Sequence, residues 1–137
     1  MLEGSTCHLL IEYSANLEPR IQIGALIDKL HSTAIGTGVF PVGGARTRAM
    51  RRDQYRVADG AAANAFVHLT MRVGHGRSVA TRRDAAEAIF AALCAHLATI
   101  YADTPLAISA EMQEIDPQFS FKQNNLHERL AKTHGEQ

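Results

Sequence analysis

The chain has 137 residues, of which 46% are hydrophobic and 20% are charged, and its formal net charge is zero. This length suits one domain, which buries roughly 68% of the surface that the unfolded chain exposes. The composition argues against a disordered tail, and the zero net charge argues against a general attraction to nucleic acid or anionic membranes. The sequence contains no run of about 18 apolar residues, so no membrane-spanning helix is expected.

Cysteine content and the first residues indicate the compartment. Cys7 and Cys94 form no disulfide framework and fit a reducing environment. Cys94 lies in a helical pattern and is expected in the core. Residues 1–6 lack the basic stretch followed by an apolar one that is typical of a signal peptide. We therefore expect a cytoplasmic protein.

The first half of the chain predicts a strand, a helix and a second strand. Residues 7–14 predict a strand, and the helix that follows opens near Pro19, which is tolerated in a first turn. The apolar residues at helical spacing are Ile23, Leu26, Ile27, Leu30 and Ala34. An extended segment then runs from Arg46 to about Val57.

The second half repeats this order. Residues 64–73 predict a strand, Thr81 begins a helix in a sequence that resembles a capping box, and residues 106–115 predict another strand. The apolar stripe of this helix consists of Ala85, Ile89, Leu93, Leu97 and Ile100.

Two strand–helix–strand units predict an α/β (α+β) fold, a duplicated β-α-β. Each unit implies parallel strands, with helices on one face of the sheet. Because the helices suffice for one face, the other face is expected to meet another subunit. A C-terminal tail begins at about residue 118. Its polar segment is expected to dock on a neighbour or line a site, or else Asn124 or Asn125 caps a short helix.

Two arginines follow glycine-containing turns. Arg46 follows residues 43–45 and Arg77 follows residues 74–76. Glycine allows a sharp turn or a close backbone approach, and each guanidinium presents a charged fork that matches a carboxylate. Two such forks facing one cleft would suit a small substrate with two or more carboxylates.

The sequence contains no pattern typical of a metal site, a nucleic-acid-binding surface or a phosphate-binding loop. The seven histidines lack the spacing of metal ligands, so no metal site is expected. The arginines between residues 46 and 56 are not interleaved with aromatic residues on a positively charged chain, so nucleic-acid binding is not expected. The glycine-rich turns lack the Lys-Ser/Thr of a phosphate loop.

Several motifs, taken in order, resemble the 5-carboxymethyl-2-hydroxymuconate Δ-isomerase family of the tautomerase superfamily. The matching residues are His8, Glu12 and Ser14, followed by residues 38–41, 44–48, 58–60, 65–68, 74–78 and 121–125. They extend over nearly the whole chain, from about residue 7 to 130. No single motif is specific, but the ordered set is.

The resemblance implies a fold, an activity and a site. It implies a tautomerase-like homotrimer with active sites near subunit boundaries, with no metal and no organic cofactor. It implies an isomerase that moves a proton within an unsaturated polycarboxylate during homoprotocatechuate breakdown, with an amino-terminal proline as base. The implied catalytic residues are Cys7, at the position of that proline, together with Arg46 and Arg77. The implied substrate-binding residues are His8, Arg46, Arg77, Lys122 and Asn124.

The base is where this sequence departs from the family. Family members begin Met-Pro-His, whereas Cys7 precedes His8 here and no proline occurs before Pro19. Residues 1–6 are then an extra segment, from a tag or a misread start, ahead of a single domain at 7–137. Alternatively, the protein is a non-catalytic trimer of the same fold that binds a small acid. A third explanation takes His8, or a Cys7 thiolate with a pKa lowered by the arginines, as the base.

Overall fold

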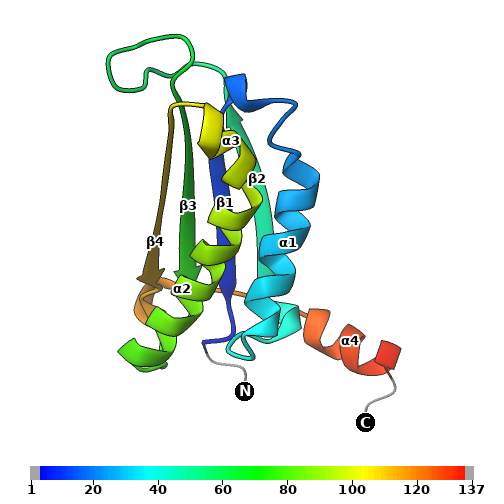
Figure 1. Ribbon diagram of the computed structural model, residues 1–137. Coiled ribbons are helices and arrows are strands. Elements are labelled where there is room, and N and C mark those ends of the chain that lie inside the picture. Colours follow the sequence, from blue (N-terminus) through cyan, green and yellow to red (C-terminus); the bar gives the residue numbers. More distant parts are fainter. Residues whose placement is uncertain (1–3, 135–137) are drawn as a thin grey trace.

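A computed structural model describes residues 4–134 (Figure 1), so residues 1–3 of the predicted N-terminal segment and residues 135–137 lie outside the part described. The chain forms a four-stranded sheet in the order β2-β1-β3-β4. The strands are β1 (Cys7–Ser14), β2 (Ala45–Arg52), β3 (Ala65–Val73) and β4 (Leu106–Glu114). β1 pairs with β2 and β3 pairs with β4 in parallel, whereas β1 and β3 are antiparallel. The duplicated β-α-β prediction is confirmed.

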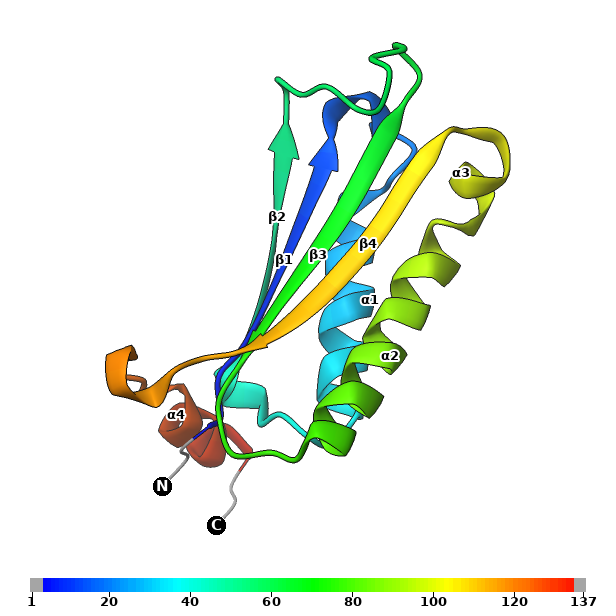
Figure 2. The ribbon, with the colours of Figure 1, turned by 90° about the vertical axis from the view of Figure 1, so that its left-hand side faces the viewer.

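The helices are α1 (Ile23–Gly36), α2 (Val79–His96), α3 (Ala98–Asp103) and α4 (Leu126–His134). Short 3-10 turns are η1 (Ala15–Leu17), η2 (Val42–Gly44) and η3 (Pro117–Phe119). α1 and α2 cover one face of the sheet, and the segment after β4 leaves the sheet on the opposite side (Figure 2). One face of the sheet is therefore left without helices, as the sequence predicts.

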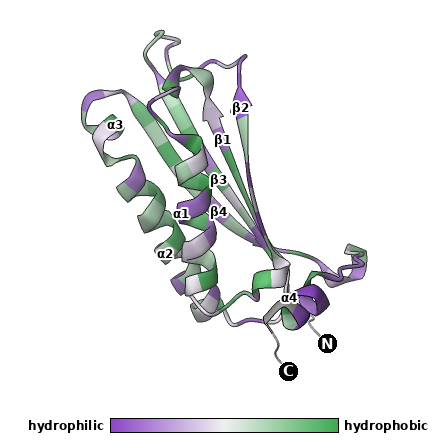
Figure 3. Ribbon diagram, turned by 90° about the vertical axis from the view of Figure 1, so that its right-hand side faces the viewer, coloured by the Kyte–Doolittle hydropathy of each residue, from purple (hydrophilic) through white to green (hydrophobic). Residues whose placement is uncertain are grey.

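The core lies between the two long helices and the sheet. Successive side chains of a strand point to opposite faces, so Leu9 and Ile11 of β1 are buried against the helices while His8, Leu10 and Glu12 face the open side. The predicted apolar stripe of the second helix, which ends at Ile100 in α3, lies in this core. Hydrophobic residues are concentrated in β1, β3 and the long helices, whereas α4 is mostly hydrophilic (Figure 3).

Two predicted boundaries in the first half are wrong. α1 begins at Ile23 and not near Pro19, because Leu17 and Ile21 are buried and hold the intervening residues in a tight turn, closed by Ile21 N donating to Leu17 O at 2.9 Å. β2 ends at Arg52 and not near Val57. There the chain folds into a loop that is closed by Asn64 Nδ2 donating to Val57 O at 3.0 Å.

The second helix begins earlier than predicted and is interrupted. Ser78 caps it, because its hydroxyl accepts a hydrogen bond from Thr81 N at 3.1 Å and α2 starts at Val79. At Leu97 the backbone leaves helical geometry, with φ −92° and ψ 3°, so the predicted single helix is divided into α2 and α3. The capping box predicted at Thr81 is therefore wrong by one turn.

The structure also tests the predicted burial of Cys94 and the prediction that no helix spans a membrane. Cys94 is half-buried and is not part of the core cluster, so its predicted place in the core is wrong, and burial raises the pKa of its thiol. Across residues 4–134, none of the helices combines the length and apolar character that crossing a membrane requires.

Candidate active site

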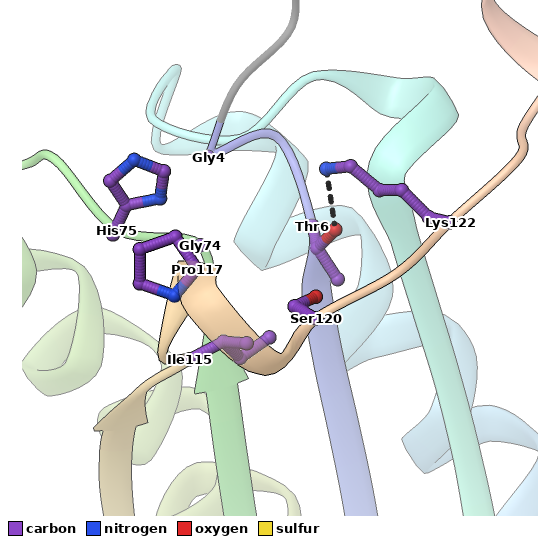
Figure 4. Close-up of a pocket in the computed structure, with 8 residues that line it drawn as sticks. All are labelled: Gly4, Thr6, Gly74, His75, Ile115, Pro117, Ser120 and Lys122. Carbon is purple, nitrogen blue, oxygen red and sulfur yellow. Dashed lines mark hydrogen bonds between the residues drawn. The ribbon is translucent and has the colours of Figure 1, made fainter.

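A cavity of about 180 Å³ lies at the end of the sheet where β1 begins and β3 and β4 finish (Figure 4). Its lining residues come from the chain before β1, the turn after β3 and the tail. They are Gly4, Thr6, Gly74, His75, Ile115, Pro117, Ser120 and Lys122. The ends of both β-α-β units and the C-terminal tail therefore meet at one place.

The tail brings Lys122 to the cavity. Lys122 Nζ donates to Thr6 Oγ1 at 3.2 Å. Two residues further on, Asn124 Nδ2 donates to the Gly43 carbonyl at 3.0 Å, and Asn124 Oδ1 accepts from Leu126 N, at the start of α4, at 2.8 Å. The tail therefore lines a cavity within one chain, and Asn124 also caps the helix that follows it. Contact with a neighbouring subunit stays a prediction.

Arg77 is held by backbone carbonyls. Its Nε and Nη2 donate to the Val39 carbonyl at 3.1 and 2.9 Å, and its Nη1 donates to the Gly74 carbonyl at 3.3 Å and to the Gly4 carbonyl. The guanidinium also lies over the Phe40 ring, 5.1 Å from the ring centre. Four of the five N–H groups of this side chain are thus engaged. As the chain is described, Arg77 presents no open fork for a carboxylate.

Residues 4–6 run close against the two glycine-containing turns that precede Arg46 and Arg77. Ser5 and Thr6 are 4% and 8% exposed. A side chain at Gly44 would overlap the Ser5 carbonyl, and one at Gly74 would overlap the backbone of Gly4. The glycines therefore serve a close backbone approach, and what approaches them is the chain just before β1.

Cys7 is fully buried on the helix side of β1. Burial raises the pKa of the Cys7 thiol to about 11, and the opposing effect of the Arg77 charge is smaller. The expectation that nearby arginines lower this pKa is wrong, because the desolvation of a thiolate in the core outweighs the attraction. A thiol with this pKa is protonated at neutral pH.

His8 lies on the open face of the sheet among three arginines. It is paired with Arg46 on β2 and with Arg72 on β3, and Arg48 Nη1 donates to His8 Nδ1 at 3.1 Å. Burial, followed by the charges of Arg48, Arg46 and Arg72, lowers the pKa of His8 below its usual 6.5. His8 is therefore neutral at pH 7, with its proton on Nε2 because Arg48 can only donate.

This environment predicts a pH dependence of stability. As the pH falls, His8 takes up a proton in the unfolded chain before it does so in the folded chain, because its pKa is lower in the folded chain. The contribution of His8 to the free energy of unfolding should therefore be fully present above a pH of about 6.5, and it should be lost as the pH falls from there towards the folded pKa. His8→Gln should remove part of this loss. Urea unfolding at several pH values, at one protein concentration, measures it. Equal losses of stability in the two proteins would contradict the prediction.

The two predicted arginines do not converge within one chain. Arg46 is half-buried on the open face, makes no hydrogen bond or ion pair among the residues described, and acts on His8 through its charge. Neither arginine lines the cavity of Figure 4. A substrate role for Cys7, His8, Arg46, Arg77 and Asn124 stays a prediction, whereas Lys122 does line the cavity.

Sequence reasoning missed Thr6, Ser120 and Arg72. Thr6 and Ser120 supply hydroxyl groups at the cavity, but no local pattern marks them. Arg72 could have been found, because alternation along residues 64–73 places it on the same face as His68. In the part of the chain that the structure describes, no three His, Cys, Asp or Glu side chains form a group suited to a metal ion.

Two β-α-β units with both helices on one face, and a cavity at the start of the first strand, define a protein with the tautomerase-like fold. The family model of 5-carboxymethyl-2-hydroxymuconate isomerase matches residues 7–130. The chain belongs to this family.

Individual relatives agree with the family. The 5-carboxymethyl-2-hydroxymuconate Delta-isomerase of Escherichia coli is 37% identical over 120 residues, which cover 88% of this chain and 95% of that protein. The crystal structure of a 5-carboxymethyl-2-hydroxymuconate isomerase from Deinococcus radiodurans R1 is 38% identical, with a TM-score of 0.88 over 95% of this chain and 98% of the other. A more distant structure, described as a fused 4-OT symmetric trimer, is 19% identical with a TM-score of 0.55 over 79% and 85% of the two chains, and shares the fold alone.

Proposed function

We propose that this protein is an isomerase that moves a proton within an unsaturated polycarboxylate such as 5-carboxymethyl-2-hydroxymuconate, in the breakdown of homoprotocatechuate. The family match over residues 7–130 is the observation that carries the proposal. The unpaired cysteines, Cys7 and Cys94, support a cytoplasmic location.

The reaction needs a base and cations, with no net oxidation or reduction. The base takes the proton of the dienol hydroxyl, the C–O bond becomes a carbonyl, and a proton is returned to a carbon further along the conjugated system. Lys122, at the cavity, would bind a carboxylate of the substrate. A cation aimed at the developing oxyanion stabilises the transition state more than the ground state.

The open face of the sheet supports a homotrimer. This face carries Leu10 and Phe66, both half-buried, as well as the arginines around His8. The fused 4-OT structure of the same fold is a symmetric trimer. In such an assembly, Arg46 of one subunit would complete the cavity of another, which would explain why Arg46 does not line the cavity of its own chain. Sedimentation equilibrium tests this proposal, and a stable monomer would contradict it.

The alternative function is that of a non-catalytic trimer that binds a small acid. The observation that favours it is the backbone nitrogen of Cys7, which is an amide and therefore not basic. This alternative retains the cations and the cavity but lacks the base.

The ultraviolet absorbance of 5-carboxymethyl-2-hydroxymuconate separates the two functions. We expect the protein that begins at residue 7 to speed conversion above the spontaneous rate. Arg46→Ala should lower turnover by about one to two decades, because a hydrogen bond to a charged group is worth roughly 1.5–3 kcal/mol. Arg56→Ala, in the exposed loop after β2, is the matched control. Spontaneous rates throughout, with the acid still raising the melting temperature, would overturn the enzyme and support the binding protein.

A further inference from the structure

The chain just before β1 forms part of the wall of the cavity that the proposed function assigns to substrate. Gly4 and Thr6 are themselves lining residues of this cavity. Figure 4 shows the chain of residues 4–6 crossing between His75 and Lys122, with the Thr6 hydroxyl turned towards the Lys122 amine. The family match covers residues 7–130, and residues 4–6 precede it.

Two cations of the predicted site bind oxygen atoms of this segment. Lys122 Nζ donates to Thr6 Oγ1 at 3.2 Å, and Arg77 Nη1 donates to the Gly4 carbonyl. A hydroxyl and a carbonyl oxygen therefore stand where carboxylate oxygens of a substrate would be bound. Removing the segment would free one N–H group of Arg77 and the amine of Lys122 from these contacts.

The segment is built to stay in this position. Gly74 N donates to the Thr6 carbonyl at 2.9 Å, which continues the pairing of β1 with β3. Gly4 has φ +73°, and a side chain there would overlap the His75 carbonyl oxygen. Ser5 and Thr6 are almost fully buried. The position of this segment therefore depends on glycine at position 4 and on a hydroxyl group at position 6.

We propose that residues 4–6 form an autoinhibitory segment, which lines the polycarboxylate cavity and engages Arg77 and Lys122 through the Gly4 carbonyl and the Thr6 hydroxyl. Displacing it enlarges the cavity and frees these two cations for an acid. This inference rests on the proposed function for the class of ligand, but it concerns binding and not the chemical step.

Single substitutions in the full chain test the proposal with muconate, a dicarboxylate that lacks the dienol hydroxyl. Gly4→Ala should tighten muconate binding, measured by calorimetry, by about tenfold or more, the factor that one hydrogen bond to a charged group supplies. Thr6→Val should also tighten it. Gly24→Ala is the matched control, because a side chain at this position in α1 meets open space, and its affinity should equal that of the parent.

A second measurement uses the protein without residues 2–6. It should bind muconate at least as tightly as Gly4→Ala, and Lys122→Ala in this protein should abolish the gain. Equal affinity of the parent, Gly4→Ala and Thr6→Val would overturn the proposal, as would a lack of muconate binding by every form. Tight binding by the opened forms without isomerisation would leave this proposal standing and overturn the proposed function. Isomerisation with unchanged affinity would do the reverse.

Discussion

A protein that begins at position 7 with proline, made by removing residues 2–6 and changing Cys7→Pro, is expected to isomerise 5-carboxymethyl-2-hydroxymuconate about 10²–10⁴-fold faster than the full chain. This range is the usual contribution of a well-placed general base. In the full chain the nitrogen of residue 7 is an amide. A free α-amino group titrates near ~8, and a nearby cation favours its neutral form. Arg77 supplies such a charge, since it already acts on the Cys7 thiol.

The matched control is the same Cys7→Pro variant beginning at Thr6. It lacks Gly4 and Ser5, but its free amine is displaced by one residue and its proline nitrogen is an amide. Initial rates followed by ultraviolet absorbance should be high for the protein that begins at proline and near the spontaneous rate for the control. The active protein should lose activity as the pH falls through the pKa of the amine. Equal rates for the two proteins would show that the free amine is not the base.

Local periodicity accounts for the parts of the fold that could be predicted. The strand at residues 7–14 has the bounds of β1, and the apolar stripe of the second helix is buried as expected. Both patterns are repeated along several turns or pleats, so no single residue decides them. The start of α2 depends on one hydroxyl, and Ser78 and Thr81 are both suitable caps. Only the path of the chain selects between them.

The site was less predictable because its geometry depends on distant partners. The sequence shows the charge of Arg77, but its guanidinium binds the Val39 and Gly4 carbonyls, 38 and 73 residues away. No local pattern encodes these contacts. The thiol of Cys7 is a similar case: the arginine nearby was predicted, whereas the burial that dominates its pKa follows from packing of the whole domain.

Arg77→Ala is expected to destabilise the protein by about 3 kcal/mol, even though the residue was first predicted to bind substrate. The substitution leaves the carbonyls of Val39, Gly74 and Gly4 without the donor that now serves them. A buried acceptor that loses its partner costs roughly 1–3 kcal/mol, and water entering the space would lower the sum. Urea unfolding at fixed protein concentration measures the loss. Arg77→Lys should recover only part of it, because an ammonium cannot span the same set of carbonyls.

The matched control for Arg77→Ala is Arg83→Ala, a substitution of an exposed arginine on α2. Arg83 is 76% exposed and pairs with Glu87 one turn away, so its removal should change stability by about 0.5 kcal/mol or less. A stable Arg77→Ala protein that no longer binds muconate would contradict the structural role and assign the guanidinium to substrate. If Arg77→Ala instead destabilises the full chain more than the protein without residues 2–6, the difference between the two losses in free energy of unfolding measures what the contact of Arg77 with Gly4 contributes to stability. The same side chain then serves two purposes in turn: it holds the segment in the full chain, and it offers the released N–H group to a carboxylate once the segment is displaced.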